Sequence, residues 1–481
     1  MGHGPTLCDL LYDVNDYLTA GHFRGHLGAM TDNKQSQPIG LTPVLDEISE
    51  VLFGKVIDQL PDWSSELLED DPPPPVELKL PEWNPSPDQE VAWEKITSWI
   101  EDNSPDKQML FSFGGLGGTG KTFLTSRLAV WLLNKGIEAV YAAPTGKAVL
   151  VLKNNLAKMG LTGELVTVRT VHGTIYKPVE DKNTGRILGW EERGDADYDI
   201  ILVDEFSMVA APELAALRRL GKPILAIGDH GQLSPVGEDT GVMLNPDVKL
   251  EKIHRLAHGN PIIRLAHMVR RGAPDDVIRD FIDDMDDPRL SWSRQIGDAI
   301  EKGKPPGVVL TFTNRMRRNI NIQYREDVLS LDEYDGPAQG EMIICLKNKR
   351  LNDSGFMVPN GMRGVIVSQP RVTEHHVYAD VQFDEPVGLL TDFCMCKHQF
   401  LREKTFAGFD EVPGKPYGWG GVGALCDFSY AITGHKSQGS GFPSVVVVVE
   451  RALGVLSDEE RKRWLYTAYS RSSDSLHVIF A

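Results

Sequence analysis

The stretch Met109–Thr122, MLFSFGGLGGTGKT, decides how the rest of this chain is interpreted. A short strand-like run enters a glycine-rich turn, and Gly115–Thr122 fits the pattern G-x-x-x-x-G-K-[ST] of a phosphate-binding loop. Glycines let the backbone wrap a phosphate chain so that successive N–H groups point inward. The amphipathic run Phe123–Lys135 follows, and a helix there presents its positive end to the same phosphates. The stretch therefore predicts a nucleotide-triphosphate site.

Two side chains of this loop have expected roles. Lys121 supplies a point charge for the outer phosphates, and the Thr122 hydroxyl is placed to hold Mg²⁺. The alternative is a glycine-rich turn without a ligand, which the apolar strand before it and the helix after it disfavour. The residues predicted to hold the nucleotide are Gly115, Gly117, Gly118, Thr119, Gly120, Lys121, Thr122 and Phe123.

Length and composition indicate a soluble multidomain protein. The chain has 481 residues, which is too long for one core and predicts about three to four domains. No apolar run approaches the ~20 residues of a membrane span, and the first residues lack the basic and apolar regions of a secretory signal. Five cysteines form an odd, sparse set that favours a reducing interior. We expect a cytoplasmic protein of prokaryotic or viral origin with no membrane partner.

The net charge of −18 speaks, taken alone, against nucleic acid as a partner. This argument is weak, because binding needs a local basic groove and not a basic whole. Much of the acid lies in two runs, Glu66–Asp71 and Asp283–Asp287, which we expect to be solvated faces or linkers.

Strands that alternate with helices indicate a doubly wound α/β domain around the loop. Apolar runs at Glu138–Ala143, Asp199–Val203 and Pro223–Gly228 each end in polar residues. Alternation over Tyr176–Glu192 predicts a hairpin inserted in this domain. Because the carboxyl ends of parallel strands meet at one edge, the polar residues should gather there.

A second set of strands is expected at 308–312, 426–432, 445–449 and 476–480. The run Val445–Val449 is five valines, which is typical of a strand buried on both faces. Between residues 341 and 425 short alternating strands (342–346, 364–367 and 378–383) separated by Gly, Pro and Asn predict a small inserted β-barrel. Residues 1–80 carry two amphipathic stripes and the acidic linker Asp70–Pro75, and they are expected to form a helical accessory module.

Five residues are candidates for hydrolysis chemistry. Asp204 would reach Mg²⁺ through water, and Glu205 would orient and deprotonate the attacking water. Gln232 is a candidate contact for the outermost phosphate, with a plain loop residue as the alternative. Arg255 and Arg471 are candidates for neutralising transition-state charge, although isolated arginines usually form surface ion pairs.

The chain resembles superfamily 1B DNA helicases, specifically the RecD-like/Dda-like group, from about Trp83 to Ala481. The stretches that carry the resemblance follow the family order: SPDQ with Gln89, GGLGGTGKT, APTGKA (143–148), TVHG (170–173), VDEFSM (203–208), GDHGQLSPVG (228–237), IHR with Arg255, TFTNRMRRNIN (311–321), AITGHKSQGSGF (431–442) and YTAYSRSSD (466–474). One departure is Gly434, where the family usually has a bulkier residue, and a looser loop is expected there.

The resemblance implies two RecA-like P-loop domains with ATP and Mg²⁺ between them. The implied organisation is a first motor domain at 81–260, a pin hairpin insert at 175–197, a second motor domain at 261–340 and 426–481, and an SH3-like insert at 341–425. Gln89 would present its amide to adenine. Thr122 and Asp204 would serve the metal.

The resemblance also implies 5′→3′ movement on single-stranded and fork DNA, with contacts mostly to the DNA backbone. The residues that fit such contacts are Pro144, Thr145, Lys147, His172, Thr313, Asn314, His435, Lys436 and Ser437. His435 has a structural imidazole as its alternative. We expect a monomer whose residues 1–80 bind a replication or recombination protein.

Two other interpretations stay open. The chain could be a DNA-stimulated ATPase that displaces proteins, or a recruited switch, without strong duplex unwinding. The cluster Cys394, Cys396 and His398, with Cys426 as a possible fourth ligand, could invite a metal, but its spacing is atypical for zinc.

Overall fold

The computed structural model describes residues 78–80, 82–180, 187–194, 197–235, 237–252, 259–295, 297, 307–332, 336–351, 356–385, 387–414 and 421–480. The two amphipathic stripes and the acidic linker predicted for the N-terminal region lie outside these residues, as do the hairpin tip and Arg255. Within the described ranges no helix is both long and apolar enough to cross a membrane.

The first lobe is a parallel sheet in the order β3-β2-β6-β7-β1-β8. Its strands are β1 (Leu110–Gly115), β2 (Ala139–Ala143), β3 (Thr167–Thr170), β6 (Ile200–Val203), β7 (Ile224–Gly228) and β8 (Val248–Leu250). Its helices are α4 (Pro87–Glu101), α5 (Lys121–Asn134), α6 (Gly146–Ala157), α7 (Val171–Ile175) and α8 (Ala211–Arg219). Separate hydrophobic clusters bury the two faces of the sheet. The predicted α/β fold is confirmed here, and β3 and β8 are additional strands.

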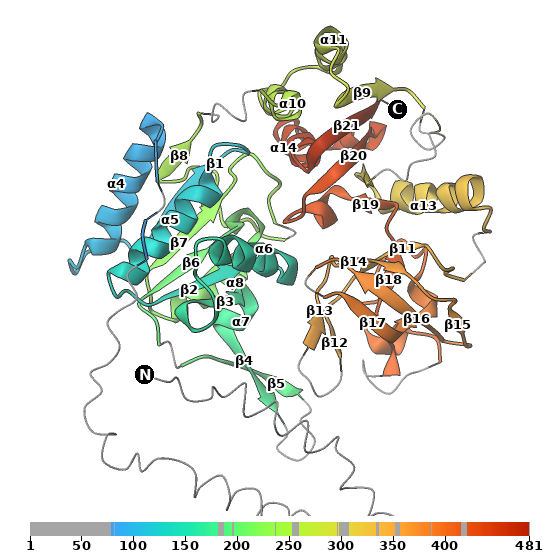
Figure 1. Cartoon of the computed structure of the whole chain (residues 1–481), viewed down its shortest axis with the longest axis horizontal. Helices are drawn as coiled ribbons and strands as arrows, with labels where there is room; N and C mark the ends of the chain where they lie inside the picture. The colour runs from blue at the N-terminus through green and yellow to red at the C-terminus, as the bar shows by residue number, and fades with distance from the viewer. Residues whose placement is uncertain are drawn as a thin grey trace, which may run out of the picture. The chain divides into compact units, whose positions relative to one another are not determined.

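A two-stranded hairpin leaves this lobe after α7 (Figure 1). Its strands are β4 (Tyr176–Glu180) and β5 (Ile187–Glu192). They pair antiparallel, with Tyr176 opposite Glu192 at one end and Glu180 opposite Ile187 at the other. The alternation seen in the sequence therefore does form a hairpin. Its role is a separate question.

The second lobe is another parallel sheet, in the order β19-β10-β20-β21-β9. Its strands are β9 (Leu290–Ser293), β10 (Val308–Thr311), β19 (Ala431–Thr433), β20 (Phe442–Val449) and β21 (Ser472–Phe480). Its helices are α10 (Pro261–Arg270), α11 (Asp275–Met285), α13 (Asn314–Leu329) and α14 (Asp458–Tyr469). The five valines of β20 are all buried, as a strand covered on both faces requires.

An antiparallel sheet is inserted between α13 and β19, in the order β15-β16-β14-β11-β18, with β17 paired to β16. The strands are β11 (Met342–Cys345), β14 (Arg363–Ile366), β15 (Arg371–Val372), β16 (His376–Phe383), β17 (Leu389–Cys396) and β18 (Cys426–Phe428). A ribbon of β12 (Lys349–Leu351) and β13 (Phe356–Val358) accompanies them.

The structure corrects one predicted strand. Residues 426–432 were expected to form a single strand of the second α/β sheet, but they are divided between two sheets. β18 pairs with β11 in the insert, whereas β19 pairs with β10 in the second lobe. The chain therefore crosses from insert to lobe at Ser429–Tyr430, between two strands that have different pairing partners.

Candidate active site and nucleic-acid cavity

The glycine-rich loop joins β1 to α5 at the carboxyl edge of the first sheet. Gly118 and Gly120 have φ values of 78° and 90°, in the left-handed region that favours glycine. A Cβ at Gly115 would lie 2.8 Å from atoms of both Thr119 and Lys121, so the loop closes tightly on itself there. The backbone has the cradle geometry that the sequence predicted.

The ammonium group of Lys121 is turned toward the loop. It donates to the carbonyl oxygens of Gly115 at 2.6 Å and Leu116 at 3.1 Å, and it lies 3.7 Å from a carboxylate oxygen of Asp229. Asp229 is buried and follows β7. The predicted cation is therefore held at the loop beside Asp229, a polar residue at the end of a predicted strand to which the sequence analysis assigned no role.

Gln89 ties α4 to the same loop. Its amide nitrogen donates to the Thr119 carbonyl at 2.9 Å, and its amide oxygen accepts from the Ser86 N–H at 3.1 Å. Both ends of the buried amide thus contact backbone. The structure places Gln89 as a brace of the loop, and its predicted contact with adenine stays a prediction.

Asp204 and Glu205 follow β6 at the edge that also carries the loop. Burial, together with the charge of Glu205, raises the pKa of the Asp204 carboxyl to about 6. An Asp204 oxygen accepts from the Glu205 N–H at 2.8 Å. Glu205 has a φ of 51°, a left-handed conformation that costs a non-glycine residue about 1 kcal/mol or more. Strain of this kind is often found at functional sites.

Gln232 lies on the turn after β7, where its amide nitrogen donates to Asp229 at 3.3 Å. Its amide oxygen is buried and has no hydrogen-bond partner among the described residues. An unpartnered buried acceptor is costly and requires an explanation such as a bound group. Gln232 thus lies at the same carboxyl edge of the sheet as Lys121 and Asp204.

The second lobe reaches the loop through residues that were not predicted. The Gly117 N–H donates to the Tyr466 hydroxyl of α14 at 2.6 Å, and the Gly117 carbonyl lies 3.2 Å from the His267 ring of α10. Arg471 was predicted to neutralise transition-state charge at the nucleotide. Here its guanidinium donates to the Thr467 and Ser440 carbonyls of its own lobe. Tyr466 lies inside a stretch already quoted above, but His267 carries no signal in the sequence.

The chemistry of these groups fits a metal-bound nucleotide. Thr122 is exposed at the start of α5, and the hydroxyl and carboxylate oxygens of Thr122 and Asp204 are the hard ligands that Mg²⁺ prefers. The loop supplies backbone donors and Lys121 supplies charge.

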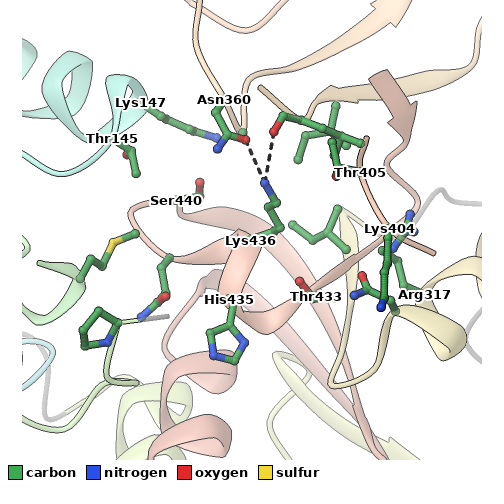
Figure 2. Close-up of a pocket in the computed structure, with 18 of the residues that line it drawn as sticks. Thr145, Lys147, Arg317, Asn360, Lys404, Thr405, Thr433, His435, Lys436 and Ser440 are labelled. Atoms are coloured by element: carbon green, nitrogen blue, oxygen red, sulfur yellow. Dashed lines mark hydrogen bonds between the residues drawn. The ribbon is translucent and has the colours of Figure 1, made fainter. Parts of the chain in front are cut away.

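A cavity of about 610 Å³ lies between the two lobes and the insert (Figure 2). Five predicted DNA contacts line it: Thr145, Lys147, Asn314, His435 and Lys436. Pro144, His172, Thr313 and Ser437 do not. Residues that the sequence did not suggest also line it, notably Arg317, Asn360, Arg402, Lys404 and Thr405. The structure thus gathers residues more than 250 positions apart.

The cavity is locally basic in an acidic protein. Its lining includes five lysines and arginines against two glutamates, Glu213 and Glu403. Burial lowers the pKa values of both Lys147 and Lys436. The Lys436 ammonium donates to Asn360 at 3.0 Å and toward the Leu346 carbonyl at 3.5 Å (Figure 2). The local charge removes the objection raised by the net charge of −18.

Several predicted contacts have internal roles instead. The Thr145 and Thr313 hydroxyls cap the helices α6 and α13 by accepting from Ala148 and Met316. Thr313 also donates to Glu450 at 2.7 Å. The buried Ser437 hydroxyl donates to the Gly434 carbonyl at 2.7 Å. These side chains position the loops, which leaves backbone groups and neighbouring residues to meet a ligand.

Histidines 435 and 172 differ in setting. Burial lowers the pKa of His435, so the ring is neutral near pH 7 and adds no charge to the cavity. His172 is exposed, and its ring lies 4.7 Å from Trp190 and 4.8 Å from Tyr176 at the base of the hairpin. Trp190 itself is 52% exposed. His172 therefore belongs to an aromatic group on the hairpin rather than to the cavity.

Gly434 is a required glycine and does not loosen its loop. A Cβ there would lie 2.8 Å from the indole nitrogen of Trp464, which is fully buried. The space of the bulkier family residue is thus filled from α14, which corrects the expectation of a looser loop.

The cysteine cluster of β17 is not assembled as a metal site. Among the residues that the structure describes, no group of three or more His, Cys, Asp or Glu side chains could hold a metal ion. His398 contacts His375 at 3.0 Å, and Cys426 lies directly opposite Cys345 across the β11–β18 pair.

Comparison with known proteins finds an AAA domain at residues 96–286 and a UvrD-like helicase C-terminal domain at residues 428–479. The chain is 26% identical over 393 residues to the ATP-dependent RecD2 DNA helicase of Deinococcus radiodurans, covering 74% of this chain. It spans only 45% of that relative's length. Similar solved structures include a Pif1 helicase from Candida albicans, which is 17% identical with a TM-score of 0.46, the match covering 83% of this chain and 96% of that one. Another is a Bacteroides Pif1 bound to ssDNA, which is 17% identical with a TM-score of 0.48, the match covering 82% of this chain and 92% of that one.

Proposed function

We propose, on the premise that this chain belongs to the RecD-like group of superfamily 1B helicases, that it is an ATP-dependent 5′→3′ DNA helicase. The premise is supported by the AAA and UvrD-like domain matches and by the likeness to RecD2. One observation supports the proposal above all others. The basic cavity is lined by residues from both lobes, while the second lobe also contacts the glycine-rich loop.

The proposed ATP site uses the residues at the edge of the first sheet. Lys121 and the loop N–H groups bind the phosphates, and Glu205 orients and deprotonates the attacking water. Thr122 and Asp204 would hold Mg²⁺, which supplies positive charge at the outer phosphates. Gln232, whose buried amide oxygen has no partner among described residues, contacts the outermost phosphate or its water. Arg255 and Arg471 stay candidates for transition-state charge.

The proposed DNA path runs through the cavity. Lys147, Lys404 and Lys436 offer cations to phosphates, and Asn360 and Thr405 offer neutral polar groups. Arg317 also lines the cavity, but its guanidinium is paired with the buried carboxylate of Asp427. Such a lining grips the backbone with little readout of base edges. Because residues of both lobes grip the strand, a change in the spacing of the lobes would move it.

The two inserts have proposed roles that follow the family pattern. The β4–β5 hairpin with Trp190 would act as a pin at the fork, and the antiparallel sheet would serve as the SH3-like insert that closes the DNA path. Residues 1–80 would bind a replication or recombination partner. The four described cysteines are all free, which suits a reducing interior. The protein would act as a monomer.

Strand displacement tests the proposal. Forks with a single 5′ or a single 3′ tail would be offered in DNA and RNA versions, with ATP and Mg²⁺. We expect unwinding of the 5′-tailed DNA fork only. Unwinding from the 3′ tail alone would overturn the direction, and the absence of DNA-stimulated ATP hydrolysis would overturn the motor assignment.

Lys121→Ala is the matching variant. We expect hydrolysis to fall by roughly 10²-fold or more, because a positioned charge at the phosphates is lost, while binding of single-stranded DNA changes little. Lys135→Ala, at the residue directly after the same helix, exposed and paired with Glu101, is the control and should behave as wild type. Normal turnover in Lys121→Ala would refute the site.

A further inference from the structure

Both backbone polar groups of Gly117 are contacted by side chains of the second lobe. Its N–H donates to the Tyr466 hydroxyl at 2.6 Å, and its carbonyl lies 3.2 Å from the His267 ring nitrogen. Tyr466 is fully buried, and a Cβ at Gly231 would lie 2.9 Å from its ring. Gly117 and Gly231, on two loops of the first lobe, therefore leave the space that the Tyr466 side chain occupies.

The same hydroxyl also donates to Asp229 at 2.9 Å. Asp229 lies 3.7 Å from the Lys121 ammonium and accepts from the Gly231 N–H at 2.9 Å. Tyr466 is thus an acceptor toward the glycine-rich loop and a donor toward the carboxylate beside Lys121. A single side chain of α14 connects both parts of the proposed phosphate site.

A further chain of contacts leads from α14 to the basic cavity. The Thr467 hydroxyl, next to Tyr466, accepts from the Leu233 N–H at 3.0 Å. The Leu233 carbonyl accepts from the Gln438 side chain at 3.2 Å, and Gln438 lines the cavity. Hydrogen bonds therefore connect the Gly117 peptide, α14, the turn after β7 and the cavity wall.

The Gly117 N–H has one hydrogen to donate. We propose that Tyr466 is the positioning residue through which the second lobe responds to nucleotide: a phosphate oxygen and the Tyr466 hydroxyl compete for the Gly117 N–H. Nucleotide binding takes that hydrogen bond away from α14, and α14 passes the change to the cavity through Thr467, Leu233 and Gln438. This inference rests on the proposed binding of a nucleotide at the loop.

Tyr466→Phe tests the competition, because it removes the hydroxyl and keeps the ring in its seat. With a fluorescent ADP as the probe, the variant should bind about two- to tenfold more tightly than wild type, since nucleotide no longer has to displace an acceptor worth one hydrogen bond. DNA stimulation of ATP hydrolysis should fall, because the contact that reports nucleotide to the cavity is absent. Purely structural damage would lower the melting temperature without tightening nucleotide binding.

Tyr469→Phe is the matched control. Tyr469 lies on the same helix and is equally buried, but its hydroxyl has no hydrogen-bond partner among the described residues. We expect this variant to match wild type in nucleotide affinity and in DNA stimulation. A shift equal to that of Tyr466→Phe would overturn the inference, since it would report general repacking of α14.

Nucleotide affinity that is unchanged or weaker in Tyr466→Phe also overturns the inference. His267→Ala provides a second control, because His267 contacts the Gly117 carbonyl and not the N–H, and it should leave nucleotide affinity close to that of wild type. Failure of the proposed function looks different: wild type would then bind no ADP, and Lys121→Ala would change nothing. If wild type binds ADP and only the tyrosine effect is missing, the nucleotide site stands and the competition is rejected.

Discussion

The surroundings of a single residue in this protein depend on which residues of the other lobe lie next to it. Lys147 starts a helix in the first lobe, but its ammonium group lies 5.5 Å from the ring centroid of Phe442 in the second. It lines the cavity with Lys436, which comes from nearly 300 positions later. The cations proposed to bind DNA are therefore those that the fold brings to one cavity, and the number of cations in the sequence says little about them.

Lys147→Ala should weaken binding of single-stranded DNA and lower its salt dependence. Each phosphate neutralised contributes about −0.7 to the slope of log K against log salt for a single strand, so the slope should fall in magnitude by about 0.7. Titrations at several salt concentrations measure it. Lys153→Ala, on the exposed face of the same helix, should leave the slope unchanged. An equal effect of both variants would argue against the cavity as the DNA path.

At the scale of elements, the inserted sheet is joined to the second lobe through buried charge. Arg325 of α13 donates to Glu341, just before β11, at 2.8 Å, and both side chains are almost completely buried. The same guanidinium donates to the Asp332 and Gly336 carbonyls of the connecting segment. Burial raises the pKa of Glu341 even though Arg325 opposes the rise. The pair thus determines how insert and lobe are joined.

Arg325→Met should lower the free energy of unfolding by about 3–5 kcal/mol at pH 7, because it leaves Glu341 buried without its cation. Removing the cation raises the pKa of Glu341 further, so protonation restores part of the stability as pH falls from 7 to 5, and that gain is lost as pH rises. Urea unfolding at both pH values measures this. The double variant with Glu341→Met should recover much of the loss, and a loss independent of pH would contradict the account.

The hairpin is the element whose role is most separable from the ATPase. Among the described residues its two strands pair only with each other, so shortening it should leave both lobes intact. Replacing residues 181–189 by a two-residue turn should spare DNA-stimulated ATP hydrolysis and reduce unwinding of forks. A variant with Gly and Ser at residues 182–185 keeps the length and serves as the control. Unchanged unwinding in the shortened variant would reject the pin.

At the scale of the whole molecule, charge is unevenly distributed. Residues 1–77 contain fourteen carboxylates and three lysines or arginines, whereas the cavity lining has five cations and two carboxylates. The net charge of −18 therefore describes mainly a region outside the proposed DNA path. We therefore expect the acidic segment to weaken DNA binding through long-range repulsion that salt screens.

Neutralising the acidic run by Glu66→Gln, Glu69→Gln, Asp70→Asn and Asp71→Asn should strengthen DNA binding at low salt. The gain should disappear above about 0.5 M salt, where the Debye length falls to a few ångströms. Fluorescence anisotropy with a labelled single strand measures both conditions. Four Asp→Asn changes at Asp276, Asp280, Asp283 and Asp284 of α11, which remove the same amount of charge, are the control. Weaker binding in the first variant would mean that the acidic run aids the DNA interaction.

The sequence by itself determined the local parts of this protein. The turn at Gly115–Thr122, the apolar strands and their polar ends follow from residue type and spacing, because these depend on neighbours in the chain. The fold class was therefore predictable. Of the nine residues predicted to contact DNA, five line the cavity.

Only the tertiary structure decided which residues meet across the lobes. The division of 426–432 between two sheets depends on pairing partners, and the filled space at Gly434 depends on Trp464 of a distant helix. Tyr466 reaches the glycine-rich loop, while Arg471, five residues later, bonds within its own lobe. A contact between segments some 350 residues apart is set by the packing of whole lobes, and no local pattern encodes it.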